Sequence, residues 1–163
     1  MSVPHIAPAK GMRSFEFEQS KYKHLDKVLP CRLLAIGASN SGKGIAVQSL
    51  ILDVFRGQWK RIYYFSKTAL VDHTLEPIEK YVRQVLKVPI EEDWRFSEWD
   101  PAVVKGIIDQ QKSIIEYEKK HNFKTLHGIL IVCDDFAGDF QIMRGKQGEA
   151  LKDLFLMGRH YGI

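Results

Sequence analysis

The sequence lacks the features that mark several protein classes. No stretch approaches the ~20 consecutive apolar residues of a membrane-spanning helix, and no apolar segment typical of a secretory signal follows the N-terminus. The only two cysteines, Cys31 and Cys133, lie in or beside apolar runs, so we expect buried thiols in a reducing compartment. The six histidines show no metal-ligand spacing with each other or with cysteine. We therefore expect a soluble, intracellular protein that has no membrane partner.

The composition is that of an ordinary globular domain. The 163 residues are 45% hydrophobic and 27% charged, enough for one hydrophobic core. A net charge of +4 is compatible with a nucleic-acid partner. The basic residues are scattered, however, and solvated helix ends explain the densest groups better. Charge alone therefore does not identify a partner.

The pattern of apolar residues predicts a polar extension over 1–29 and an α/β domain over 30–163. In the extension, the alternation over 14–18 predicts a short edge strand. The domain begins with a buried strand, Leu33 to Ile36, then a small-residue turn, a helix from Ile45 to Phe55 and a strand from Arg61 to Phe65. A strand–helix–strand unit of this kind predicts a right-handed crossover and a parallel sheet.

The second half continues the alternation of helices and strands. We expect helices over 75–86, from Pro101 onward and over 147–157, a strand or ordered loop over 94–99, and the most apolar strand over 128–133. Asp100 is a helix cap in front of Pro101. The buried face of that helix is predicted to carry Val104, Ile107, Ile108, Ile114 and Ile115. The predicted fold is a three-layer α/β domain with a mostly parallel central sheet.

The turn between the first strand and helix has the spacing G-x-x-x-x-G-K. Its residues are Gly37, Ala38, Ser39, Asn40, Ser41, Gly42 and Lys43. Small residues allow successive backbone N–H groups to surround phosphate oxygens, and the lysine reaches the β- and γ-phosphates. The alternative is an ordinary glycine-rich turn that happens to be followed by a lysine. The position between a strand and a helix favours a phosphate-binding loop.

Asp134 and Asp135 end the apolar strand, about ninety residues after Lys43. A carboxylate at the carboxyl end of a parallel strand faces the ligand crevice of an open α/β sheet. The first would hold Mg²⁺, and the second would orient and deprotonate the attacking water. Capping of the next turn is the alternative. The order and separation of the two motifs favour the metal site.

Two further groups of residues have ordinary explanations. An arginine such as Arg159, after the last predicted helix, can contact a γ-phosphate or reach a neighbouring subunit's site. A helix-terminal cation beside the helix dipole explains its position better. The tryptophans are better explained by packing than by stacking on single-stranded nucleic acid.

Three segments together resemble the genome-packaging ATPases of large DNA viruses, the poxvirus-type members of the FtsK/HerA group of P-loop NTPases. They are 34–43, 129–135 and 158–163, the last containing the pair Arg159-His160. The resemblance covers about residues 30–163. It implies an ATP-driven, ring-forming translocase of double-stranded DNA. Phosphate would bind at Lys43 and Mg²⁺ at Asp134, Asp135 would be catalytic, and Arg159 would have a functional role.

The sequence departs from this family in two places. Ser or Thr normally follows the lysine and gives Mg²⁺ a hydroxyl ligand, but Gly44 stands here. The family also inserts a later strand, bearing a polar sensor, between the phosphate-loop strand and the Asp-Asp strand. The printed sequence ends at Ile163, where that strand would begin, so we expect an incomplete sheet.

The sequence therefore predicts an ATP-binding ATPase of the DNA-packaging type, and its source, viral or cellular, stays open. A truncated or degenerate relative that binds nucleotide without hydrolysing it is the main alternative. A P-loop nucleotide kinase is a third, but the sequence has no arginine-rich lid segment.

Overall fold

A three-stranded parallel sheet forms the centre of the protein. The computed structural model describes residues 15–22, 25, 28–38, 40–134 and 146–163. The sheet has the order β3-β2-β5, in which β3 is Arg95–Phe96, β2 is Trp59–Ser66 and β5 is Gly128–Asp134. Both pairings are parallel, as predicted. A second, two-stranded parallel sheet joins β1 (Glu16–Phe17) to β4 (Thr125–Leu126), which confirms the edge strand expected in the N-terminal region.

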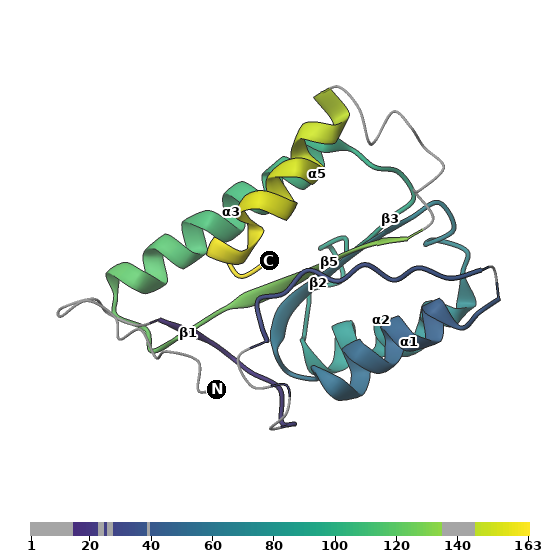
Figure 1. Ribbon diagram of the computed structural model, residues 1–163, viewed down its shortest axis with the longest axis horizontal. Helices are drawn as coiled ribbons and strands as arrows, with labels where there is room; N and C mark the ends of the chain where they lie inside the picture. The colour runs from purple at the N-terminus through teal and green to yellow at the C-terminus, as the bar shows by residue number, and fades with distance from the viewer. Residues whose placement is uncertain (1–14, 23–24, 26–27, 39, 135–145) are drawn as a thin grey trace, which may run out of the picture.

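Helices cover both faces of the larger sheet, which gives a mixed α/β fold with four described α-helices (Figure 1). One face carries α1 (Lys43–Ser49), continued by a π-helical segment (Leu50–Val54), and α2 (Glu76–Lys80), continued by another (Tyr81–Val85). The other face carries α3 (Pro101–Lys120) and α5 (Lys146–Met157). Short 3₁₀ turns precede α2 (His73–Leu75) and follow α5 (Gly158–His160).

Each face of the sheet has its own hydrophobic cluster. Ile51, Ile62 and Val82, each at most 1% exposed, pack between the sheet and the α1 and α2 layer. Phe65 and Val104, both fully buried, pack between the sheet and the α3 and α5 layer. Burial on both faces explains why β2 and β5 are apolar runs rather than alternating ones.

The local signals that predicted the helices have the expected geometry. The Asp100 carboxylate accepts a hydrogen bond from the Ala102 amide at 2.7 Å, so it caps α3 as predicted. Gly57, at φ 87°, lies shortly after the π-helical segment that continues α1. A glycine in this left-handed conformation is a common helix terminator. No helix among the described residues has the length and apolar character needed to cross a membrane.

The strand predicted over Leu33 to Ile36 does not form. Residues 31–38 are irregular and exposed, with Leu33 65%, Leu34 76% and Ile36 86% accessible to solvent. Among the described residues, β5 pairs with β2 on one edge and no strand pairs with 31–38. An extended segment becomes a strand only when a neighbour accepts its backbone hydrogen bonds. The apolar run alone was therefore not enough to make this segment a strand.

Candidate functional site

The predicted phosphate-binding loop lies directly in front of α1. Asn40 (φ 60°) and Gly42 (φ 85°) are both left-handed, a conformation that glycine adopts freely and asparagine tolerates. A Cβ atom at Gly37 would lie 2.6 Å from the Ser41 hydroxyl, so a side chain there would force Ser41 to move. The Ser41 amide donates to the Ala38 carbonyl at 3.2 Å. The loop is therefore tight and depends on its glycines.

Lys43 folds back over this loop. Its ammonium donates hydrogen bonds to the carbonyl oxygens of Gly37 and Ala38, both at 2.9 Å. The lysine thus holds a positive charge across the loop that precedes its own helix. Ser39 was also predicted to take part, and it lies outside the described residues.

Gly44, the position that departs from the full motif, is open. It is exposed in the first turn of α1, and a Cβ atom there would meet nothing within 4 Å. Its backbone lies within the helix, a conformation open to every L-residue except proline. Steric conflict therefore does not explain the absence of a hydroxyl residue.

Asp134 ends β5 and is held by the neighbouring strand. The Tyr64 hydroxyl on β2 donates to Asp134 Oδ2 at 3.0 Å, while Ser66 pairs directly with Asp134 in the strand register. The carboxylate is half-buried, and its second oxygen, Oδ1, takes no part in this bond. A fixed carboxylate with one oxygen outside its protein hydrogen bond suits a Mg²⁺ that also binds phosphate and water. Asp135, the predicted catalytic base, lies outside the described residues.

The loop and Asp134 lie at the same end of the molecule. Figure 1 shows the carboxyl end of β5 and the turn before α1 on its right side. Tyr64, the partner of Asp134, belongs to the hydrophobic cluster on the α1 face of the sheet. Asp134 therefore faces the same layer that carries Lys43. Among the described residues, the segment before the loop is exposed and pairs with no strand, so the sheet does not fix the loop relative to Asp134.

Arg159 and His160 lie toward the other end of β5. Both are exposed in the 3₁₀ turn after α5, and the carbonyl of Gly162 just beyond them accepts a bond from the Ile129 amide at 2.8 Å. Along β5, Ile129 and Asp134 are about 16 Å apart, because a strand rises ~3.3 Å per residue. The structure therefore does not bring Arg159 to Asp134 of the same chain.

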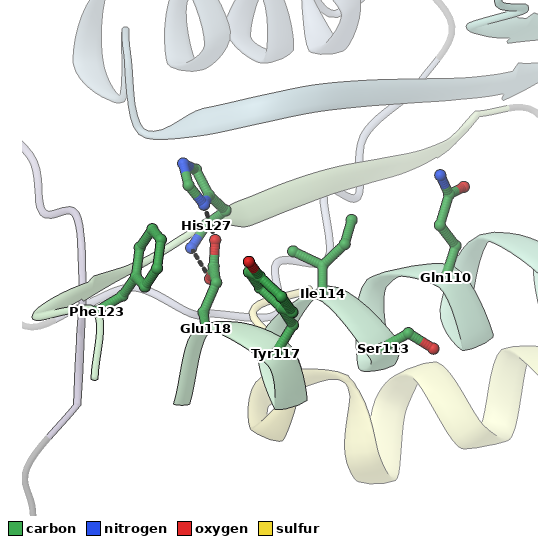
Figure 2. Close-up of a pocket in the computed structure, with 7 residues that line it drawn as sticks. All are labelled: Gln110, Ser113, Ile114, Tyr117, Glu118, Phe123 and His127. Carbon is green, nitrogen blue, oxygen red and sulfur yellow. Dashed lines mark hydrogen bonds and ion pairs between the residues drawn. The ribbon is translucent and has the colours of Figure 1, made fainter. Parts of the chain in front are cut away.

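A groove that the sequence did not predict lies at the amino-terminal end of β5, beside α3. Its volume is about 540 Å³, and Figure 2 shows its lining residues: Gln110, Ser113, Ile114, Tyr117, Glu118, Phe123 and His127. Ile114, predicted to be buried, is 38% exposed and lines this groove. A smaller cavity of about 220 Å³ shares Gln110, Ile114 and His127 with it.

Glu118 and His127 form a clamp inside the groove. Glu118 is only 3% exposed, and its Oε2 accepts the His127 backbone amide at 3.0 Å while Oε1 contacts Nδ1 of the same residue. Burial, and then the Lys60 charge, lower the pKa of His127, while the Glu18 charge acts in the opposite direction. The pair ties the end of α3 to the start of β5. Among the described residues no group of three or more His, Cys, Asp or Glu is placed to bind a metal.

The sequence carried a signal for this clamp. Val104, Ile107, Gln111, Ile115 and Glu118 follow the three- and four-residue spacing of one helix face, and all are buried. The two polar members of that face are both engaged, since Gln111 donates to the carbonyls of His127 (2.7 Å) and Tyr161 (2.8 Å). A charged residue on an apolar helix face therefore indicated a buried partner.

The prediction of two buried thiols is wrong. Cys31 and Cys133 are both solvent-exposed and neither forms a disulfide. Cys31 lies in the segment that failed to become a strand, and Cys133 lies next to the end of β5. Although Cys133 reaches solvent, its apolar surroundings raise the pKa of its thiol to about 12. That thiol is protonated at neutral pH and is a poor nucleophile.

Comparisons with protein-family models, with curated proteins and with solved structures find no match to this chain. The functional interpretation therefore rests on the residues themselves.

Proposed function

We propose that this chain binds ATP through the loop over residues 37–44. The observation that carries the proposal is the arrangement of Lys43, whose ammonium bridges two carbonyls of a tight, glycine-dependent loop in front of α1. Phosphate oxygens would replace the carbonyls of Gly37 and Ala38 as partners of this ammonium. Charge-assisted bonds of this kind are among the strongest a loop can offer a phosphate.

Asp134 is the proposed Mg²⁺ ligand of the same site. It ends β5 on the face that α1 covers, and Tyr64 fixes one of its oxygens. Mg²⁺, when bound with the nucleotide, neutralises charge on the phosphates. Asp135, next in the sequence, is proposed to orient the attacking water and accept its proton.

The reaction that we propose is ATP hydrolysis coupled to movement of double-stranded DNA, as the resemblance to viral packaging ATPases implies. Within that proposal, Arg159 acts on the nucleotide of a neighbouring subunit in a homo-oligomeric ring. Its exposed position, toward the end of β5 opposite Asp134, supports a role between subunits rather than within one.

A second candidate is a module that binds nucleotide without hydrolysing it. Two observations favour it. Gly44 offers no hydroxyl to a metal ion, and the segment before the loop is exposed rather than part of the sheet. A loop that no strand fixes relative to Asp134 would bind phosphate but align it poorly for attack by water.

Turnover measurements separate the two candidates. We expect an ATPase activity that double-stranded DNA stimulates and that Lys43→Ala abolishes. Lys105→Ala, which removes an exposed lysine from α3, serves as the matched control and should leave the rate unchanged. ATP binding without turnover, with or without DNA, would support the second candidate. Absence of nucleotide binding would contradict both.

A further inference from the structure

Tyr64 is a buried hydrogen-bond partner of Asp134, the proposed metal ligand. It lies in the middle of β2, is only 3% exposed and donates its hydroxyl to Asp134 Oδ2 at 3.0 Å, across 70 residues of sequence. In the strand register, Tyr64 pairs with Val132, so its side chain reaches two residues along β5 on the same face. The contact is therefore built by the central strand pair rather than by a mobile loop.

We propose that Tyr64 is a positioning residue for Asp134 in Mg²⁺ binding. This inference rests on the proposed function. By holding Oδ2, the Tyr64 hydroxyl fixes the orientation of the carboxylate and leaves Oδ1 outside that bond. Partners of this kind fix the direction of a metal ligand, and their loss commonly weakens metal binding by about 10- to 100-fold.

The position of Gly44 increases the importance of this contact. The loop offers no hydroxyl ligand after Lys43, so the proposed site relies more heavily on the Asp134 carboxylate as a side-chain metal ligand. When a site has fewer protein ligands, its affinity for Mg²⁺ depends more strongly on how the Asp134 carboxylate is oriented. Tyr64 supplies that orientation from within the core.

A purely structural role is the alternative, because a buried tyrosine hydroxyl needs a hydrogen-bond partner. Both roles predict some loss of stability in Tyr64→Phe, so stability does not separate them. The dependence of nucleotide binding on Mg²⁺ does. A positioning role affects binding only when the metal is present, whereas a structural role affects binding with and without it equally.

The test measures the dissociation constant for ATP by calorimetry, in excess Mg²⁺ and in EDTA, for the wild type and Tyr64→Phe. We expect the ratio of the two constants, EDTA over Mg²⁺, to fall about tenfold in the variant, with the EDTA value unchanged. Tyr63→Phe is the matched control. It is a neighbour that is also buried (8% exposed) but whose side chain belongs to the cluster on the opposite face, and it should leave the ratio unchanged.

The outcomes are distinct. An unchanged ratio in a folded Tyr64→Phe would overturn the positioning role and leave the proposed function intact. A wild type that binds no ATP in either condition would overturn the proposed function itself. A crystal structure of the wild type with ADP and Mg²⁺ provides a test that does not need the variant. The Tyr64 hydroxyl should stay bonded to Asp134 there, and a Tyr64 turned away from it would refute the inference.

Discussion

Restoring the missing hydroxyl at Gly44 tests whether this position limits hydrolysis. The substitution Gly44→Ser adds a hydroxyl directly after Lys43, where the full phosphate-loop motif has its Mg²⁺ ligand. The structure accommodates it, because a Cβ atom at Gly44 meets nothing within 4 Å. Serine is also a better helix former than glycine, so we expect folding stability to rise by less than about 1 kcal/mol.

The expected effect on the rate follows from the added ligand. A hydrogen bond or ligand contact to a charged group contributes about 1.5–3 kcal/mol, and each 1.36 kcal/mol in the barrier changes a rate tenfold. We therefore expect the ATPase rate of Gly44→Ser at saturating ATP to rise about tenfold or more, with a lower Mg²⁺ requirement.

Gly44→Ala separates the hydroxyl from the backbone effect. Alanine adds the same Cβ atom and favours the helix more strongly, but it offers no ligand. Steady-state phosphate release, measured over a range of Mg²⁺ concentrations, is the assay. Equal rates for the serine variant, the alanine variant and the wild type would refute the idea that the missing hydroxyl limits catalysis.

Two further predictions concern stability. Glu118→Ala should lower the free energy of unfolding by about 1–3 kcal/mol, because it leaves the His127 backbone amide and its partly exposed ring without their carboxylate partner. Glu116→Ala, on the exposed face of α3, should change stability little in urea denaturation. Equal effects of the two variants would contradict the clamp. Ile36→Gln should change the free energy of unfolding by less than about 0.5 kcal/mol, because Ile36 is 86% exposed. The buried control Ile62→Ala should lower it by about 2–4 kcal/mol. A loss at Ile36 as large as that at Ile62 would show that the segment around Ile36 is buried.

The elements that the sequence predicted well are those with strong local signals. The Asp100-Pro101 start of α3 is one, and the apolar β2 and β5 strands are others. Cap chemistry and continuous apolar runs act within a few residues, so they can be interpreted without knowing the tertiary structure. The parallel direction of the sheet followed from the alternation of strands and helices, but the sequence did not predict that β2 and β5 pair with each other.

The features that the sequence did not predict depend on distant partners. Leu34 lies in an apolar run typical of a strand, yet it is 76% exposed, and no strand of the described part of the chain pairs with its segment. Glu118 has the charge of a surface residue, yet it is buried because His127 satisfies its carboxylate. The contact between Tyr64 and Asp134 depends on strand register, which composition does not determine.

Titration of ATP into the wild type and Lys43→Ala, in the presence of Mg²⁺, tests the central claim most directly. Removing the ammonium that bridges Gly37 and Ala38 should weaken ATP binding by about 10- to 100-fold, from the ~1.5–3 kcal/mol of a charge-assisted contact. Lys105→Ala should bind as the wild type does. Equal affinity of Lys43→Ala and the wild type would contradict the account, because the loop would then not be the phosphate site.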